Sequence, residues 1–432
     1  MFLSATGSVT AVADARGLAL LVLEKCEAGQ YASLALDTAI KRNNLSPADR
    51  ALLSTLVYGV LETRLTLDYA IDRLSENKKI EPVVRNLLRL GLYQLAYLEK
   101  IPDHAAVNET VAASPARAKG FVNAILRSFL RSGKEMPLPD KNIDPLPYLS
   151  VRYSVCLALV EEFVRAFGTD RAEAILAAFS ERPGLDLRIN TLKTSTADYQ
   201  KLLAEHGIEA KPLDCDGLTL AESLPVSRIP GFDEGLSFVQ DEASQLAVKA
   251  LGARPGEIIL DACACPGSKS FGLAIDMKNE GTLIACDLHE SKLSLVKTGA
   301  ERLGISILSV EQKDARADRP AWHGFFDRIL CDVPCSGFGV LAKKPELRYK
   351  DPAESIALPG IQQEILSRSA EFLKVGGSLL YSTCTLLERE NGDVVRDFLA
   401  KNKQFSLVEE RTLFPDRDHT DGFYFALLKK EA

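Results

Sequence analysis

Five short apolar segments in the second half of the chain constrain its fold more than any other feature. They read IILDAC, LIACDL, ISILSV, RILCDV and SLLYSTC, and stretches of ten or more residues separate each from the next. Strands that alternate with such stretches form parallel sheets, because a parallel connection needs a crossover of about a dozen residues. We therefore predict a parallel α/β domain with crossover helices over residues 236–432.

The first 140 residues follow a different pattern. Apolar residues recur every three or four positions there, as in RNLLRLGLYQLAYL, and Gly and Pro fall between the periodic segments. Placed in this way they begin or end helices without interrupting them. The pattern predicts a bundle of five or six helices over residues 1–140. The segment SGKEMPLPDKNIDPLP has four prolines, which favours an extended linker.

Residues 141–235 combine helical runs with short strand-like segments such as LDLRINTL, which favours a small α+β unit after the linker. A chain of 432 residues exceeds the size at which single cores stop growing. The expected fold class is thus multidomain: an all-α bundle, a small α+β middle unit and a C-terminal α/β domain.

Composition narrows the expected partners, metal sites and cellular compartment of the protein. The chain has 52 Lys and Arg against 59 Asp and Glu, so a nucleic-acid partner must be bound by local basic patches. The nine cysteines lack the paired spacing of structural zinc sites, and we predict no metal and a reduced compartment. Without a signal peptide pattern or an apolar run of about 18 residues, we expect a cytoplasmic protein with no membrane partner. Separately, we expect a monomer.

One motif suggests an adenosine-containing ligand. In IILDACACPGSKS a strand gives way to small residues before a helix, a turn that lets backbone N–H groups approach a ligand. Asp287 ends the next strand candidate twenty residues after Gly267, a spacing suited to ribose hydroxyls. Asp314 follows the third, where it would meet adenine or simply cap the next turn. The absence of G-x-G-x-x-G and P-loop motifs argues against nicotinamide dinucleotides and nucleoside triphosphates.

Two further strand ends carry thiols. FDRILCDVPCSGFGV delivers Asp332 and Cys335, and LLYSTCTLLERENGD delivers Cys384, so two thiols and a carboxylate would face the ligand crevice. Most unpaired cysteines are small buried hydrophobic residues, and we interpret Cys26, Cys156, Cys215 and Cys286 in that way. The context of Cys335 and Cys384 favours a chemical role.

These motifs resemble those of the S-adenosylmethionine-dependent RNA 5-methylcytosine methyltransferases of the Sun/NOL/NOP group. DACACPGSK is similar to the family's DACAAPGGK, CDVPCSG to its DAPCSG, and YSTCTLLERENGDVV to its YSTCS and ExN segments. RLGLYQLAYLEKIPDHAAVNETV and KGFVNAILRSFLR are similar to the NusB-like RNA-binding domain of the branch that methylates bacterial 16S rRNA. The resemblance covers the whole chain and implies an rRNA methyltransferase with S-adenosyl-L-methionine as cofactor and 16S rRNA as partner.

The resemblance also implies a set of cofactor-binding residues: Cys263, Ala264, Cys265, Pro266, Gly267, Ser268, Lys269, Asp287, Asp314 and Asp332. Two of them depart from the family pattern, since Cys265 and Ser268 stand where Ala and Gly are usual. A side chain at position 268 narrows the backbone approach that glycine permits, but serine is small and we expect binding to survive. Lys269 would contribute positive charge beside the cofactor's carboxylate or an RNA phosphate.

The chemistry of the reaction explains the thiols. A thiolate that adds to carbon 6 of cytosine makes carbon 5 nucleophilic, and a carboxylate, for which Asp332 is the candidate, stabilises the intermediate. Spacing alone leaves the attacking thiol open, because DNA cytosine methyltransferases use the cysteine of a Pro-Cys motif, here Cys335. The resemblance to the RNA family indicates Cys384 as nucleophile and Cys335 as the residue that assists product release.

Two basic clusters are candidates for RNA binding, since basic side chains hold phosphates. Either cluster alone is more simply interpreted as solvated surface, but the second follows the PCSG motif directly and would lie beside the target base. The target cytosine must be unstacked to expose carbon 6. The two clusters comprise Arg117, Lys119, Arg127 and Arg131, with Lys134 beside them, and Lys343, Lys344 and Arg348, with Lys350 beside them.

Two alternative functions stay open. The catalytic motifs do not encode the target, so a 5-methylcytosine methyltransferase that acts on tRNA or another rRNA position would carry the same residues. A non-catalytic RNA-binding protein with a decayed cofactor fold is the alternative from another class. The intact Asp287, Asp332, Cys335 and Cys384 argue against it.

Overall fold

The computed structural model describes residues 14–181, 184–222 and 224–431. They divide into two compact units, a helical unit of residues up to 176 with 344–351, and an α/β unit of residues 177–343 with 352–431. The three-part division at residues 140 and 235 stays a prediction. Residues 1–13, where we expect no targeting signal, lie outside the described residues.

The helical unit begins with seven helices between residues 15 and 131, where the sequence predicts five or six. The periodicity of apolar residues does not reveal a break as short as Thr63, which is the single residue between two of these helices. Leu53, Leu56, Leu88 and Leu92 belong to its buried core. The helices are α1 (Ala15–Glu27), α2 (Ala32–Arg42), α3 (Pro47–Glu62), α4 (Arg64–Leu74), α5 (Pro82–Tyr97), α6 (Asp103–Ala113) and α7 (Lys119–Arg131).

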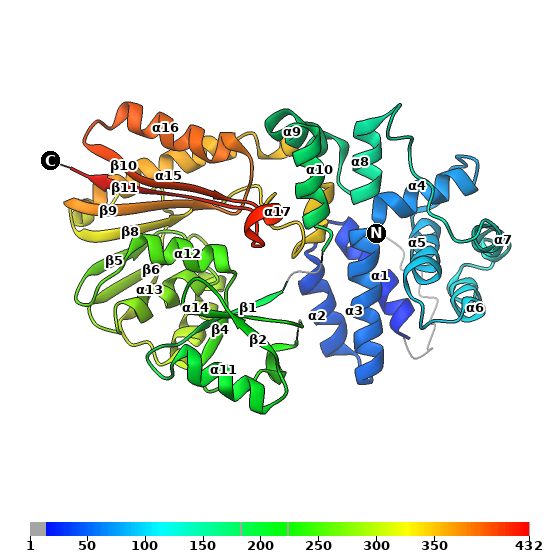
Figure 1. Ribbon diagram of the computed structural model, residues 1–432, viewed down its shortest axis with the longest axis horizontal. Helices are drawn as coiled ribbons and strands as arrows, with labels where there is room; N and C mark the ends of the chain where they lie inside the picture. The colour runs from blue at the N-terminus through cyan, green and yellow to red at the C-terminus, as the bar shows by residue number, and fades with distance from the viewer. Residues whose placement is uncertain (1–13, 182–183, 223, 432) are drawn as a thin grey trace, which may run out of the picture. The chain divides into compact units, whose positions relative to one another are not determined.

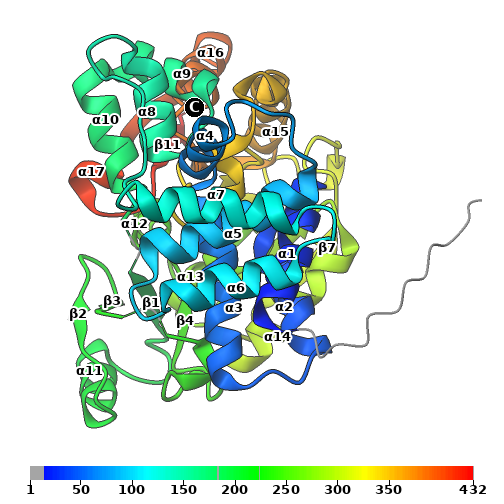
Figure 2. The ribbon, with the colours of Figure 1, turned by 90° about the vertical axis from the view of Figure 1, so that its right-hand side faces the viewer.

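Three more helices come after α7: α8 (Pro145–Tyr153), α9 (Leu157–Phe167) and α10 (Thr169–Ala178). Helix α8 starts inside the segment that we expect to be an extended linker. Its first residue is Pro145, and proline is favourable at that position because the first N–H of a helix has no intrahelical partner. In Figure 2, α5 packs against α6 and α7, as the contacts within the unit also show.

A small antiparallel sheet in the α/β unit confirms the predicted α+β segment. Its strand order is β2-β3-β1-β4, and α11 (Thr196–Glu205) packs against β2 and β3. Buried Leu187, Tyr199, Leu203 and Leu218 form the core between them. The strands are β1 (Leu185–Ile189), β2 (Ala210–Pro212), β3 (Gly217–Leu220) and β4 (Ser237–Val239).

A larger sheet of seven strands has the order β10-β11-β9-β8-β5-β6-β7. The five predicted strands pair in parallel, as expected. The sheet is nevertheless mixed, because two later strands add an antiparallel hairpin at one edge, which needs no crossover helix. The strands are β5 (Ile258–Asp261), β6 (Thr282–Asp287), β7 (Leu308–Gln312), β8 (Phe326–Asp332), β9 (Leu373–Thr383), β10 (Phe405–Leu413) and β11 (Phe423–Lys430).

Helices cover both faces of the seven-stranded sheet (Figure 1). The chain runs from β5 through β6 to β7 on one side and continues with β8 and β9 on the other, so its direction reverses between β5 and β8. Open α/β sheets bind ligands at such a reversal, at the carboxyl ends of the strands. One face carries α12 (Glu242–Leu251), α13 (Ser268–Asp276) and α14 (Glu290–Leu303), and the other carries α15 (Leu358–Phe372) and α16 (Gly392–Lys401).

Candidate active site

The predicted cofactor loop lies between the end of β5 and the start of α13. Gly267 caps α13 with a φ of 113°, and a Cβ at this position would lie 2.6 Å from Cζ of Phe271. Only glycine therefore fits. The neighbouring Ser268 is not among the residues with positive φ, so the serine in the family's glycine position imposes no backbone strain.

Asp287 fastens this loop to the end of β6. Its Oδ2 accepts a hydrogen bond from the Cys265 N–H at 3.4 Å, and its Oδ1 accepts one from the His289 N–H at 2.9 Å. The Ala264 N–H also donates to the Cys286 carbonyl at 2.7 Å. The structure thus brings the loop and Asp287 together, as the spacing predicts.

Asp314 forms its hydrogen bonds with Arg316, two residues further along the chain. Arg316 donates from Nε to its Oδ1 at 3.0 Å and from a terminal nitrogen to its Oδ2 at 2.8 Å, and the Arg316 backbone N–H also bonds Oδ1. These bonds lower the pKa of Asp314. The turn-capping interpretation thus accounts for the observed bonds, and contact with adenine stays a prediction.

Asp332 stands at the end of β8 between two donors. The Lys269 Nζ lies 2.7 Å from its Oδ2, and the Ser382 hydroxyl donates to its Oδ1 at 2.8 Å. Burial acts to lower the pKa of Lys269, but the charge of Asp332 and the hydrogen bond outweigh it, and the net shift is upward. The Lys269 ammonium also lies 5.2 Å from the ring centre of Phe423. Lysine and carboxylate thus form a charged pair at the reversal of the sheet.

The two predicted thiols meet at the ends of β8 and β9. The Sγ atoms of Cys335 and Cys384 are 3.2 Å apart, which is hydrogen-bond distance and far longer than a disulfide. All nine cysteines lie within the described residues, and none forms a disulfide there. The hydrogen bond to Cys384, burial, and the charges of Cys384 and Glu390 hold the pKa of Cys335 well above its usual value.

Close backbone contacts keep the thiols in place. The Gly339 N–H donates to the Cys384 carbonyl at 2.9 Å, and the Gly422 N–H donates to the Gly339 carbonyl at 2.8 Å. A Cβ on Gly339 would lie 1.8 Å from the Gly422 oxygen. The second glycine of the CSGFG motif is therefore required for the approach of three segments.

Several site residues escaped the sequence analysis. Ser382 is one, and Glu390 in the short helix η5 (Glu388–Glu390) is another, with its Oε2 accepting the Ser336 N–H at 2.8 Å. Asn391 accepts from the Thr383 hydroxyl at 2.5 Å. The ExN segment was part of the resemblance, but a motif with no assigned role gives no signal for a contact across the loop.

Asp261 is also new to the site. It is completely buried at the end of β5, where the Ser270 hydroxyl donates to its Oδ2 at 2.6 Å. Burial raises the pKa of Asp261 to about 7. This carboxyl therefore links the end of β5 to α13, the two elements that flank the cofactor loop.

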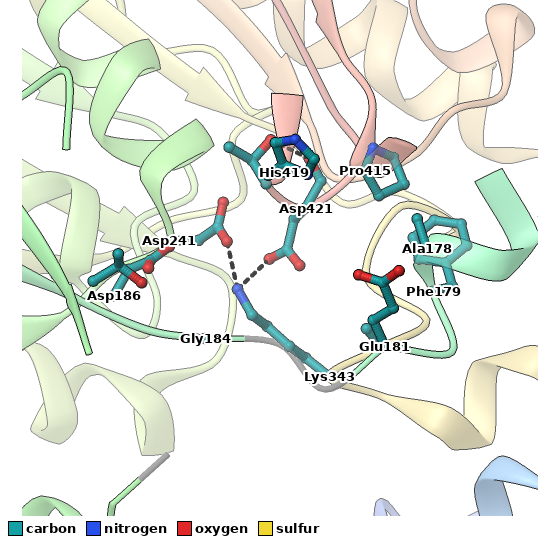
Figure 3. Close-up of a pocket in the computed structure, with 13 residues that line it drawn as sticks. Ala178, Phe179, Glu181, Gly184, Asp186, Asp241, Lys343, Pro415, His419 and Asp421 are labelled. Atoms are coloured by element: carbon teal, nitrogen blue, oxygen red, sulfur yellow. Dashed lines mark hydrogen bonds and ion pairs between the residues drawn. The ribbon is translucent and has the colours of Figure 1, made fainter. Parts of the chain in front are cut away.

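Lys343 lines a hollow of about 130 Å³ in the α/β unit (Figure 3). Its ammonium bridges Asp241 and Asp421, at 2.8 Å from the latter. Burial acts to lower the pKa of Lys343, but the charges of both carboxylates outweigh it. Burial and the nearby Asp241 raise the pKa of Asp421 to about 7. The Lys343 charge is thus already matched by two carboxylates, although the residue itself is exposed.

The next residues, 344–351, belong to the helical unit. Arg348 in the short helix η3 (Pro345–Tyr349) is only 1% exposed, and its guanidinium donates to the Tyr153 carbonyl at 2.8 Å. The Cys156 N–H donates to the Arg348 carbonyl at 2.7 Å. This burial leaves no side-chain surface of Arg348 for a phosphate, whereas Lys344 is exposed.

The N-terminal basic cluster has the opposite character. Lys119, Arg127 and Arg131 are exposed on α7, and helical spacing places Arg127 and Arg131 on the side turned away from its buried apolar residues. Arg117 is exposed too and pairs with Glu81 at 2.8 Å. These four basic side chains of the helical unit are therefore exposed to solvent.

Residues of metal-binding type gather at one exposed place in the described chain. Asp318, His323 and Glu371 offer ligand atoms within 4.8 Å of one another. Arg368 lies 3.0 Å from Asp318 and 2.5 Å from Glu371, so ion pairs account for the cluster. No helix among the described residues has the length and apolar character needed to cross a membrane.

Three family models match consecutive parts of the chain. The NusB family matches residues 13–131, a ferredoxin-like domain of RsmF/B-like methyltransferases matches 158–227, and the 16S rRNA methyltransferase RsmB/F model matches 248–429. The crystal structure of PH0851 covers 96% of this chain and 99% of its own, with 26% identity and a TM-score of 0.80. The predicted fold class is therefore confirmed.

Curated relatives match over nearly the full length. The probable ribosomal RNA small subunit methyltransferase B of Bacillus subtilis is 39% identical over 96% of this chain and 98% of its own. The ribosomal RNA small subunit methyltransferase B of Pseudomonas putida is 36% identical over 98% of both chains. The crevice at the strand ends, the NusB-type bundle and these full-length matches agree, and the chain belongs to the RsmB family of 16S rRNA methyltransferases.

Proposed function

We propose that this member of the family transfers the methyl group of S-adenosyl-L-methionine to carbon 5 of a cytosine in 16S rRNA through a covalent cysteine–cytosine intermediate. The observation that carries the proposal is the pair of thiols 3.2 Å apart at the ends of β8 and β9. Asp332 and Lys269 stand at the same strand ends. A thiol pair beside a charged carboxylate suits addition to an electron-poor ring.

The residues at the reversal of the sheet fit the cofactor. Gly267 exposes backbone at the N-terminal end of α13, where N–H groups favour an anionic carboxylate. Asp287 keeps acceptor capacity for ribose hydroxyls, because a carboxylate offers about four lone-pair sites and two are used. When bound, S-adenosylmethionine supplies an electrophilic methyl group. Residues 263–269, Asp287, Asp314 and Asp332 are the residues proposed to hold it.

Cys384 is proposed to act as nucleophile. Its thiolate would add to carbon 6 of cytosine, and the electron pair of the 5,6 double bond would move to carbon 5. Carbon 5 would then take the methyl group as the bond between that methyl and the cofactor's sulfur breaks, with the electron pair of the broken bond staying on the sulfur. A base then removes the proton from carbon 5, and the bond between sulfur and carbon 6 breaks as the double bond returns. Asp332 accepts a hydrogen bond from the exocyclic amine, and from the ring nitrogen once that nitrogen has taken up a proton in the intermediate, and it thereby stabilises the intermediate. Cys335, in contact with the departing sulfur, assists release.

The proposed RNA contacts now rest mainly on the helical unit. Lys119, Arg127 and Arg131 on α7 are exposed, with Arg117 beside them, and suit phosphate contacts that position the RNA. Lys344 is exposed as well. Lys343 would have to leave its two carboxylates to bind a phosphate, and Arg348 is buried. A 16S rRNA substrate implies work in the cytoplasm, where ribosomes assemble, and we propose a monomer.

The test is transfer of labelled methyl groups from S-adenosylmethionine to unmodified 16S rRNA and, separately, to tRNA, followed by digestion to nucleosides. We expect labelled 5-methylcytidine from the rRNA alone. Label in tRNA instead would keep the chemistry and overturn the substrate. Cofactor binding without transfer to free rRNA or to small-subunit particles at several assembly stages would favour the non-catalytic alternative.

A further inference from the structure

One buried carboxylate near the thiols has no counter-ion. Glu390 is 0% exposed, and no cation of the described residues pairs with it. Its Oε2 accepts the Ser336 N–H at 2.8 Å and the Gln362 amide at 3.1 Å, while its Oε1 has no hydrogen-bond partner. A buried charge that is neither paired nor fully hydrogen-bonded is costly, and such groups often serve function.

The position of Glu390 relates it to one thiol of the pair. Glu390 accepts a hydrogen bond from the N–H of Ser336, the residue that directly follows Cys335. The negative charge of the carboxylate is therefore next to the Cys335–Ser336 peptide bond. Lys269 lies close enough to Cys384 that a thiolate there raises the pKa of the ammonium. Like charges disfavour ionisation and opposite charges favour it. The two sulfurs therefore face opposite electrostatic surroundings.

We propose that Glu390 is a positioning residue that keeps Cys335 as the protonated partner of the thiol pair, so that Cys384 carries the negative charge. This deepens the proposed function, on which it rests, by giving a physical reason why the cysteine after β9 attacks. The Cys335 S–H then donates to the Cys384 sulfur across the 3.2 Å contact. Two thiols in contact do not both ionise readily, so a modest bias decides between them.

The other groups around Cys335 fit this assignment. The Cys384 N–H lies 3.3 Å from the Cys335 sulfur and favours ionisation of Cys335, but the influences that raise the Cys335 pKa outweigh it. Tyr381 donates its hydroxyl to the Glu390 carbonyl at 2.6 Å, and burial and the charge of Cys335 hold its pKa well above the usual value. Asp332 is occupied by Lys269 and Ser382. No cation from these elements offsets Glu390.

The first test uses the unaltered protein without RNA or cofactor. Iodoacetamide reacts with thiolates, so peptide mass spectrometry over a pH series reports which cysteine ionises first. We expect Cys384 to be alkylated before Cys335 at every pH. Faster alkylation of Cys335 would overturn the proposal. Because no methyl transfer is measured, this result is independent of whether the proposed activity exists.

The second test isolates Glu390. In a Cys384→Ala background, Glu390→Gln keeps an oxygen for both N–H donors and removes the charge. We expect Cys335 alkylation at pH 8 to become about fivefold faster or more, with its pH profile moved to lower pH. Glu388→Gln is the matched control on the same turn, because Glu388 is exposed and pairs with Arg396 at 2.8 Å. Equal rates in the Glu390→Gln and Glu388→Gln proteins would assign Glu390 a structural role only.

Discussion

The strand-end crevice and the basic segment 343–350 were both singled out by the sequence, and the structure treats them in opposite ways. In the crevice, Lys269 meets Asp332 and Cys335 meets Cys384, although these residues come from different strand ends and loops. In the basic segment, residues that are close in the sequence have different environments. The Lys343 side chain pairs within the α/β unit, Lys344 is exposed, and Arg348 is buried in the helical unit. A residue at the end of a predicted strand has a predictable place in the fold, whereas a cluster of charged residues in the sequence does not show where each side chain will lie.

The largest expected effect belongs to the crevice. Asp332→Asn removes the charge that holds Lys269 and the acceptor proposed for the cytosine, and we expect methyl transfer to fall by about 10²–10⁴-fold. Single-turnover rates with saturating 16S rRNA and S-adenosylmethionine measure it. Ser382→Ala removes only the bond to the other oxygen and should cost about tenfold or less. An Asp332→Asn protein that keeps a tenth of the rate would contradict the proposed role.

Arg348→Ala tests the second region through stability. The substitution leaves a cavity and an unpaired Tyr153 carbonyl, so we expect the free energy of unfolding to fall by about 2–4 kcal/mol. Denaturant unfolding followed by circular dichroism measures the change. Lys344→Ala, at an exposed position of the same segment, should stay within about 0.5 kcal/mol. If Arg348→Ala instead weakened RNA binding without loss of stability, the sequence-based prediction that Arg348 binds RNA would be right.

Lys343→Met gives a smaller effect that depends on pH. The pKa of Asp421 is about 7 in the folded protein, above its ordinary value near 4, so this carboxyl costs stability as pH rises between these values. Without Lys343 the cost grows, and we expect a loss of about 2 kcal/mol at pH 8 and a smaller loss at pH 5.5. Melting temperatures across pH check the sign. A loss independent of pH would show that the ion pairs are not responsible.

The smallest effect is expected at the exposed cluster on α7. Arg127→Gln with Arg131→Gln should weaken 16S rRNA binding severalfold and make the logarithmic salt slope shallower by about 1.4–1.8. Stability should not change, because both side chains are exposed. Lys41→Gln, an exposed residue of α2 paired with Asp37, is the control of equal charge change per site. An unchanged slope would remove α7 from the proposed RNA surface.

Much of the fold was predictable because its signals are local. The five apolar strands and the three-to-four-residue periodicity indicated the α/β domain and the bundle, and both are confirmed. The hairpin β10–β11 was not predicted, and the single residue Thr63 between α3 and α4 interrupts no apolar pattern. Glu390 lies 54 residues from Ser336 in the chain, so only the folded loop reveals their contact.

The most direct test of the account compares Cys335→Ala with Cys384→Ala after incubation with S-adenosylmethionine and 16S rRNA. Denaturing gels report RNA trapped on the protein, and mass spectrometry identifies the linked cysteine. The account predicts that the Cys335→Ala protein accumulates an adduct through Cys384 and that the Cys384→Ala protein forms none. An adduct that accumulates only on the Cys384→Ala protein, joined through Cys335, would contradict it.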